Sequence, residues 1–122
     1  MSVAPEMSLS ERKWYRLNET NVSRVPEGGG AYELGGRGSA VVYIGWAGSG
    51  QLGSRLRSHV ADPENACIAR SAFFFRFQLS DRPEALAVEL LEDYRSRRYG
   101  TLPECMAAPP GGPLRATPAE AR

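Results

Sequence analysis

Two short strand-like runs joined by a glycine-rich connection constrain the fold of this chain more than any other feature. The runs are GGGAYEL at residues 28–34 and AVVYIG at residues 40–45, and the tetrapeptide Gly35-Gly36-Arg37-Gly38 separates them. Such a connection is typical of a hairpin, so we expect the two runs to pair as antiparallel strands.

Side-chain alternation along the second run predicts which of its residues face the core. Successive side chains of a strand point to opposite faces, so Val42 and Ile44 are expected on one face and Val41 and Tyr43 on the other. Tyr43 can then face a cleft while its neighbours fill a core.

The rest of the chain contains two helix patterns and a third strand pattern. Residues 51–60 (QLGSRLRSHV) carry one apolar stripe, and residues 71–79 (SAFFFRFQL) alternate as a strand. Residues 80–99 begin with capping oxygens and an early proline, which predicts a second helix that ends before Gly100. The expected buried residues are Leu52, Leu56 and Val60 in the first helix, and Leu86, Ala87, Leu90, Leu91 and Tyr94 in the second. The predicted order is strand, strand, helix, strand, helix.

The length of 122 residues allows one sheet with helices on it but not two cores. We expect residues 12–106 to fold, residues 1–11 to be flexible and the Pro/Gly/Ala-rich residues 107–122 to be disordered. No apolar run approaches the roughly 20 residues of a membrane span. Residues 1–20 also lack the apolar stretch of a secretory signal, so a cytoplasmic location is expected.

The number of cysteines and histidines and the net charge limit which metals and partners the chain can bind. Cys67 and Cys105 are far apart, which favours reduced thiols over a disulfide framework. With one histidine and no cysteine pair at metal spacing, the chain lacks four good ligands for a structural zinc. The net charge of +1 neither demands nor excludes a nucleic-acid partner, because binding depends on where the arginines cluster.

Two tripeptides of the predicted hairpin, together with three later residues, resemble the GIY-YIG nuclease family. Gly30-Ala31-Tyr32 and Tyr43-Ile44-Gly45 have ten residues between their tyrosines, and Arg55, His59 and Glu89 follow in the predicted helices. The resemblance covers roughly residues 25–105 and rests on five positions in the expected order. It implies an α/β fold of the α+β type, with a three-stranded antiparallel sheet flanked by helices, and metal-dependent cleavage of DNA.

The resemblance also implies a catalytic role for each of the five residues. Glu89 resembles the family's metal-binding carboxylate and would hold one Mg²⁺ or Mn²⁺ ion. Arg55 resembles the catalytic arginine, whose guanidinium stabilises the negative charge of a phosphoryl transition state. Tyr32 resembles the tyrosine proposed as general base, Tyr43 would orient water or phosphate, and His59 would assist proton transfer or hold the phosphate.

Each of these residues, taken alone, also has a structural explanation. A lone tyrosine in a strand is more often part of a sheet core, and a lone glutamate in a helix is a solvated charge. Asp93 projects from the same flank as Glu89, so only the family motif chooses between the two carboxylates. Candidate substrate-binding residues are Arg57, which projects towards solvent, and Arg95, Arg97 and Arg98, which equally suit the dipole at a helix end.

The leading hypothesis from the sequence is a divalent-metal-dependent DNA endonuclease, selective for structure or damage, that serves DNA repair, recombination or a mobile element. RNA stays open as a substrate, no membrane partner is expected, and a monomer or weak dimer would take its specificity from a partner. Met106 stands where many family members carry Asn, and Trp46 stands where Lys is frequent. These departures favour a second hypothesis, a catalytically weak or inactive nucleic-acid-binding module of the same fold.

Overall fold

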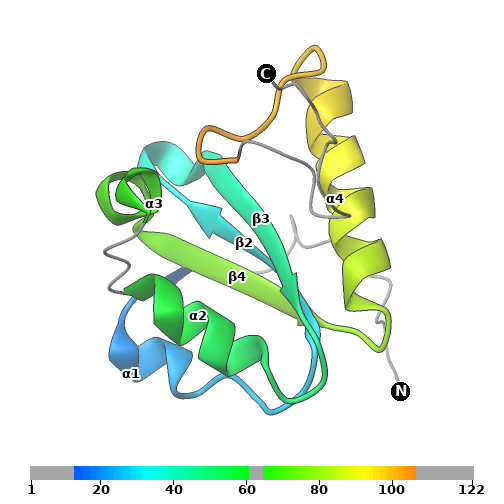
Figure 1. Ribbon diagram of the computed structural model, residues 1–122. Helices are drawn as coiled ribbons and strands as arrows, with labels where there is room; N and C mark the ends of the chain where they lie inside the picture. The colour runs from blue at the N-terminus through cyan, green and yellow to red at the C-terminus, as the bar shows by residue number, and fades with distance from the viewer. Residues whose placement is uncertain (1–12, 61–64, 107–122) are drawn as a thin grey trace.

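The computed structural model describes residues 13–60 and 65–106, which form an antiparallel sheet with helices on both faces (Figure 1). The fold class is therefore α+β, as predicted. The expectations for residues 1–11 and 107–122 lie outside the described residues. The elements in chain order are β1 (Tyr15–Arg16), α1 (Glu19–Val22), β2 (Gly30–Gly35), the 3₁₀ turn η2 (Arg37–Ser39), β3 (Val41–Ala47), α2 (Leu52–Val60), α3 (Ala66–Ser71), β4 (Phe74–Leu79) and α4 (Pro83–Arg97).

The sheet has the strand order β1-β4-β2-β3, and every neighbouring pair is antiparallel. β2 and β3 form the predicted hairpin, in which Tyr32 lies opposite Gly45. β4 pairs with the other side of β2, and β1 adds an edge strand with Tyr15 opposite Phe75. The sheet thus has four strands where three were expected, because a two-residue strand is too short to show an alternating pattern.

Side-chain alternation along β2 divides the interior into two cores. Tyr32 and Leu34 face α1 and α2, whereas Ala31 faces α4. Figure 1 shows α1 and α2 to the left of the sheet and α4 to its right. The tyrosine-side core consists of Val22, Tyr32, Leu34, Val42, Ala47, Leu52, Leu56, Ile68 and Phe75. The α4-side core consists of Ala31, Ile44, Ala87 and Leu91.

Both predicted helices bury the predicted stripe. Leu52 and Leu56 of α2 are fully buried, and Val60 packs against them at the end of the helix. All five stripe residues of α4 pack in or against the α4-side core, and Pro83 lies at the start of this helix as expected. None of the described helices is long and apolar enough to cross a membrane.

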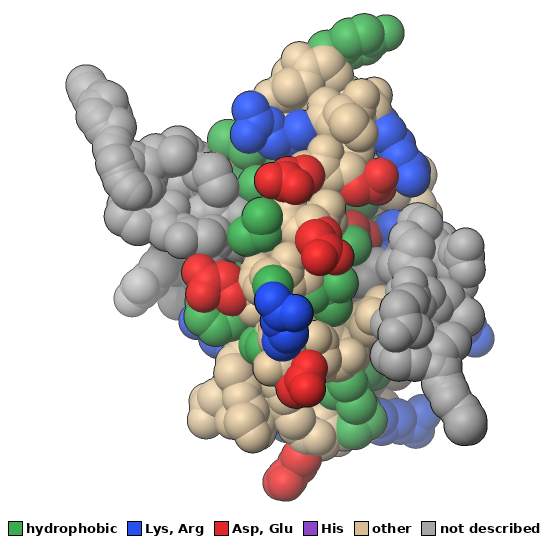
Figure 2. Space-filling view, turned by 90° about the vertical axis from the view of Figure 1, so that its right-hand side faces the viewer, with side chains coloured by type: hydrophobic (Ala, Val, Ile, Leu, Met, Phe, Trp, Pro, Cys, Tyr) green, Lys and Arg blue, Asp and Glu red, His purple; other side chains and the backbone are tan. Residues whose placement is uncertain are grey.

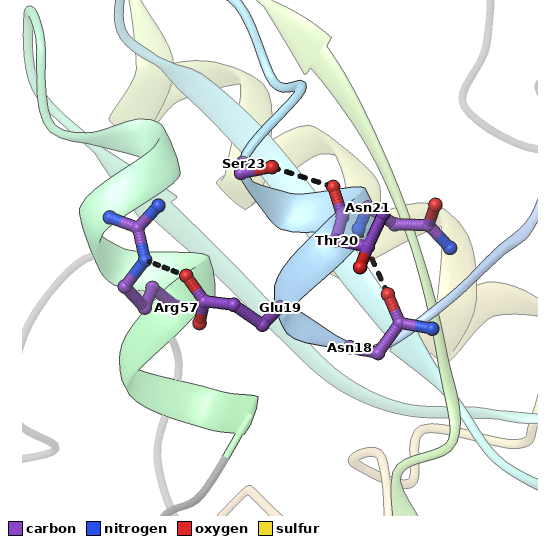
Figure 3. A network of polar contacts seen from close by, with 6 residues as sticks. All are labelled: Asn18, Glu19, Thr20, Asn21, Ser23 and Arg57. Atoms are coloured by element: carbon purple, nitrogen blue, oxygen red, sulfur yellow. Dashed lines mark hydrogen bonds and ion pairs between the residues drawn. The ribbon is translucent and has the colours of Figure 1, made fainter.

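Polar contacts stabilise the short helix α1, and the ion pair between Glu19 and Arg57 links it to α2 (Figure 3). The Asn18 side chain accepts a hydrogen bond from the Asn21 amide at 2.9 Å and so caps the N-terminus of α1. The Ser23 hydroxyl donates to the Thr20 carbonyl at 2.7 Å. Because this helix is only one turn long, it depends on such contacts and on buried Val22 rather than on its own helical hydrogen bonds.

The alternation predicted along β3 is correct for Tyr43 and Ile44 and wrong for Val41 and Val42, because Val41 packs against the α4-side core together with Ile44. Tyr43 packs against the tyrosine-side core and Ile44 belongs to the α4-side core, as expected. Val42, however, packs on the same side as Tyr43. The pairing register of β2 and β3 shifts between Leu34 and Gly35, and such an irregularity interrupts the strict alternation of side chains.

The two cysteines form a disulfide, so the expectation of reduced thiols was wrong. Cys67 lies on α3 and Cys105 lies beyond α4, 38 residues later, and their Cα atoms are 5.5 Å apart. The two cysteines are far apart in the sequence, whereas the fold brings α3 next to β3 and the segment after α4 onto the same edge. The two cysteines can therefore pair because the fold brings them together.

Candidate functional site

Four of the five residues expected to be catalytic gather on the sheet face that carries α2. The Tyr32 hydroxyl and Nε2 of His59 are 2.8 Å apart, which is a hydrogen bond whose direction depends on the imidazole tautomer. The Tyr43 ring centroid lies 6.2 Å from that of Tyr32 and 5.4 Å from that of His59. Arg55, one helical turn before His59, lies close enough to Tyr32 for its positive charge to act on the pKa of the hydroxyl. We call these four residues the tyrosine cluster.

The members of the cluster differ in their access to solvent. Tyr32 is fully buried and His59 is 8% exposed, whereas Tyr43 is half-buried and Arg55 is exposed. Tyr32 is central on β2, while His59 and Arg55 project from α2, whose leucine stripe packs on the tyrosine-side core. A ligand arriving from solvent would therefore meet Arg55 and Tyr43 first, with Tyr32 and His59 beneath them.

The phenol of Tyr32 is held in its neutral form. Burial is the main cause that raises its pKa well above the usual value, and neighbouring Tyr43 adds to the effect. The positive charge of Arg55 acts in the opposite direction but does not offset the burial. Near neutral pH Tyr32 is thus a hydrogen-bonding hydroxyl and not a phenolate.

Glu89 does not join the tyrosine cluster. α4 packs Ala87 and Leu91 onto the opposite face of the sheet, in the α4-side core. Residues two positions apart in an α-helix are rotated by about 200° from each other. Glu89 stands two positions from each of these buried residues and is exposed. Its carboxylate therefore projects from the outer side of α4, away from the sheet.

The outer face of α4 carries acidic and basic side chains along its length, as Figure 2 shows. Asp93, the other carboxylate left open by the sequence, pairs with Arg97 at 3.1 Å, and both side chains are more than half exposed. Such a surface pair adds little stability. Neither candidate carboxylate of α4 thus reaches the tyrosine cluster.

Each of the four arginines expected to bind substrate has a partner within the chain. Arg57 of α2 donates to the Glu19 carboxylate of α1 at 2.8 Å (Figure 3). At the end of α4, Arg95 donates to the Gly100 carbonyl, Arg97 pairs with Asp93, and the Arg98 guanidinium lies 5.2 Å from the centre of the Tyr94 ring. These three arginines lie with α4 and not with the tyrosine cluster.

The tyrosine cluster does not fit the expected magnesium ion. Mg²⁺ prefers oxygen ligands, above all carboxylates, and the four residues of the cluster supply no carboxylate. Over residues 13–60 and 65–106, no group of three or more His, Cys, Asp and Glu side chains is arranged to hold a metal ion. What the cluster offers is a set of hydrogen-bond donors beside one positive charge.

Gly45 and Met106 make structural contacts near the cluster that the sequence did not predict. A Cβ atom on Gly45 would lie 2.5 Å from both Cζ and Oη of Tyr32, so only glycine leaves room for that ring. Met106 accepts a hydrogen bond on Sδ from the Ile44 amide at 3.3 Å. It occupies the position at which many members of the GIY-YIG family carry Asn. Sulfur is a weak acceptor, so this contact is weaker than an amide oxygen would make.

The protonation of Tyr32 can be measured by alkaline titration of phenolate absorbance. The chain has five tyrosines. Because its raised pKa keeps Tyr32 protonated, we expect Tyr32→Phe to leave the absorbance of the folded protein unchanged around pH 10, where an ordinary tyrosine titrates. In denaturant, the same substitution is expected to remove one of five titrating phenols.

Tyr99→Phe serves as the matched control for this titration, because Tyr99 is fully exposed. This substitution should lower the phenolate absorbance in both the folded and the denatured protein. Since the pKa of Tyr32 is higher in the folded than in the unfolded state, stability should fall as pH rises above about 10, and Tyr32→Phe should reduce that slope. Equal losses of absorbance in the two variants when folded would contradict a protected phenol.

Comparison with known proteins gives a family but no activity. A family model described as a domain of unknown function (DUF7508) matches residues 7–97. This range includes every described strand, α4 and the whole tyrosine cluster. No curated protein matches the chain.

Proposed function

This chain belongs to the DUF7508 family, and we propose that it is a GIY-YIG-like domain that binds nucleic-acid phosphodiesters at the tyrosine cluster without cutting them. One observation carries the proposal: Arg55 lies with the two tyrosines, whereas Glu89 projects from the outer side of α4. A guanidinium is a fixed fork of donors that suits phosphate oxygens. The group that would hold a metal ion is not beside it.

Tyr32 also supports binding over catalysis. A general base must accept a proton near neutral pH, and burial raises the pKa of this phenol. A neutral hydroxyl instead remains able to donate or accept a hydrogen bond. In the proposed complex, Arg55 and half-buried Tyr43 meet the phosphate, and Tyr32 and His59 hold Tyr43 and Arg55 in place from below.

DNA is the proposed partner, with RNA as a second nucleic acid to be tested beside it. Phosphate contacts position a protein on nucleic acid but do not read its sequence. The domain would therefore need DNA structure, damage or a further protein for its specificity, and it would act as a monomer or weak dimer.

Binding can be tested with labelled branched, nicked and linear DNA and with single-stranded RNA. We expect the wild type to bind at least one of them and Arg55→Ala to weaken that binding about tenfold, because one charge-assisted contact is lost. The salt dependence of binding should also decrease by about one phosphate contact. Arg82→Ala is the matched control, since Arg82 is an exposed arginine at the start of α4 on the other side of the sheet.

The same panel with added Mg²⁺ or Mn²⁺ distinguishes binding from cleavage. We expect intact DNA after incubation with the wild type and with Glu89→Gln. Equal weakening by Arg55→Ala and Arg82→Ala would contradict a phosphate site at the tyrosine cluster. Failure of the wild type to bind any of the nucleic acids would overturn the proposal as a whole.

The contact between Tyr32 and His59 favours one second candidate, the metal-dependent endonuclease that the sequence predicted. A phenol hydrogen-bonded to an imidazole is a pair through which a proton can be transferred. This candidate requires Glu89 to act near Arg55 despite its position on α4. Cleavage by the wild type that is lost in Glu89→Gln would select the endonuclease over the binding module.

A further inference from the structure

We propose that the disulfide between Cys67 and Cys105 is a redox-responsive bridge that fixes the C-terminal segment onto the edge of β3 on both sides of Tyr43. We call residues 101–106 the C-terminal clasp. Cys67 belongs to α3, so the bridge ties the clasp to a helix that contacts β3. The effect on Tyr43 concerns the site of the proposed function and rests on it, whereas the effect on the clasp does not.

The clasp contacts the backbone of β3 at the two residues that flank Tyr43. The Cys105 amide donates to the Val42 carbonyl at 2.8 Å, and the Ile44 amide donates to Met106 Sδ at 3.3 Å. β3 is an edge strand in the order β1-β4-β2-β3, so these groups point away from β2, and none of the described strands pairs with β3 on that side. The clasp therefore covers polar groups of a sheet edge that would otherwise meet solvent.

Side chains of the clasp pack on both faces of the sheet. Cys105 packs against the tyrosine-side core, whereas Leu102 and Met106 pack against the α4-side core. The clasp thus wraps around the edge of the sheet, and its position affects both cores next to Tyr43. If the clasp detaches, β3 therefore loses contacts on both sides of Tyr43.

Apart from the bridge, the polar contacts between the clasp and α3 are weak. Ser71 Oγ and the Glu104 carboxylate are 3.5 Å apart, at the upper limit for a hydrogen bond, on an exposed surface. Surface contacts of this kind contribute little. The covalent bond is thus the strong tie, and its loss leaves the clasp held by the edge hydrogen bonds and its apolar packing.

The chemistry of the switch is thiol-disulfide exchange with a dithiol reductant. A thiolate of the reductant attacks one sulfur, the bond between the two cysteine sulfurs breaks, and a mixed disulfide forms. The second thiol of the reductant then displaces the protein sulfur. The reductant gives two electrons and two protons and becomes a disulfide, and the protein gains two thiols. Cys67 and Cys105 are both half-buried, so a small dithiol can reach them.

Amide hydrogen exchange measures whether the bridge holds the clasp. We expect reduction by dithiothreitol to speed exchange of the Cys105 and Ile44 amides about tenfold or more, because their partners then open locally. The amide of Leu91, in the middle of α4, reports global unfolding and should accelerate less than these two amides, only by the general loss of stability that breaking a disulfide causes. The double variant Cys67→Ser/Cys105→Ser should exchange like the reduced protein at residues 44 and 105 and should not respond to the reductant.

Each outcome of this experiment decides the proposal. Two titratable thiols per chain after reduction, with unchanged exchange at residues 44 and 105, would overturn it. Equal acceleration at Leu91 would also overturn it, because the bridge would then be a staple of the whole fold and not a local clasp.

Binding of the labelled DNA panel is measured in parallel for the oxidised, reduced and double-serine proteins. Weaker binding by the last two links the bridge to Tyr43. Equal affinity of all three would overturn that link. Absence of binding in every state would instead reject the proposed function, and the exchange rates would still decide the role of the bridge.

Discussion

Gly45→Ala is expected to destabilise the protein by about 3 kcal/mol, because an added methyl group has no room. The new Cβ would lie 2.5 Å from Cζ and Oη of Tyr32 and 2.9 Å from Cε2 of Tyr43. Tyr32 cannot move aside easily, since its ring is fully buried and its hydroxyl is hydrogen-bonded to His59. Chemical denaturation gives the free energy of unfolding. Because His59 is the single histidine, its ring signals in NMR report the lost contact with Tyr32.

Gly48→Ala is the matched control for this prediction. A Cβ on Gly48 would meet no atom within 4 Å. Replacing Gly by Ala without a clash stabilises slightly by restricting the unfolded chain, so we expect a change between zero and about 1 kcal/mol in the favourable direction. If Gly45→Ala were as mild as Gly48→Ala, or left the His59 signals unchanged, the close packing of Gly45 against Tyr32 would be contradicted.

Patterns that repeat over several turns or strand residues were sufficient to predict most of this fold. The stripe of α4 extends over about two and a half helical turns, from Leu86 to Tyr94, and its residues pack in or against the α4-side core as expected. The hairpin of β2 and β3 carried both strand patterns and a glycine-rich turn. Such repeated signals agree with one another, so a single irregular residue does not change the assignment.

Features that depend on a few contacts between distant residues were not predictable. β1 has only two residues and exists because β4 offers it an edge. Val41 and Val42 depart from the predicted alternation because the register shifts at one point of the hairpin. The disulfide forms because α3 and the clasp meet at the edge of β3. None of these causes leaves a periodic trace in the sequence.

The candidate site was predictable where it depends on neighbouring elements and not where it depends on which face a helix covers. The family motif, with strand alternation and the spacing of one helical turn, brought Tyr32, Tyr43 and His59 together, and the structure places them in contact. Which face of the sheet α4 packs against cannot be read from the sequence, but the side of α4 on which Glu89 lies can. The stripe predicted for α4 already placed Glu89 two residues from Ala87 and Leu91, on the solvent side. The motif and the periodicity thus disagreed there, and the structure follows the periodicity.

Arg76→Ala is expected to cost about 3–5 kcal/mol at neutral pH, because it leaves a buried carboxylate without its partner. The guanidinium of Arg76 lies 2.7 Å from the Glu33 carboxylate, and the two side chains are only 10% and 8% exposed. The Trp14 ring covers the guanidinium, with its centroid 4.0 Å away. Burial raises the pKa of the Glu33 carboxyl even with Arg76 beside it, so removal of Arg76 should raise that pKa further.

The pH dependence of the stability lost in Arg76→Ala distinguishes an unpaired Glu33 carboxylate from a simple loss of packing. A carboxyl group whose pKa is higher in the folded than in the unfolded state lowers stability as pH rises through that interval. The cost of Arg76→Ala should therefore shrink below about pH 4, where Glu33 is protonated in both states. The double variant Glu33→Gln/Arg76→Met removes both charges at similar volume and should recover most of the stability at neutral pH. A cost that is the same at both pH values, and that the double variant does not relieve, would assign the loss to the packing of Trp14 instead.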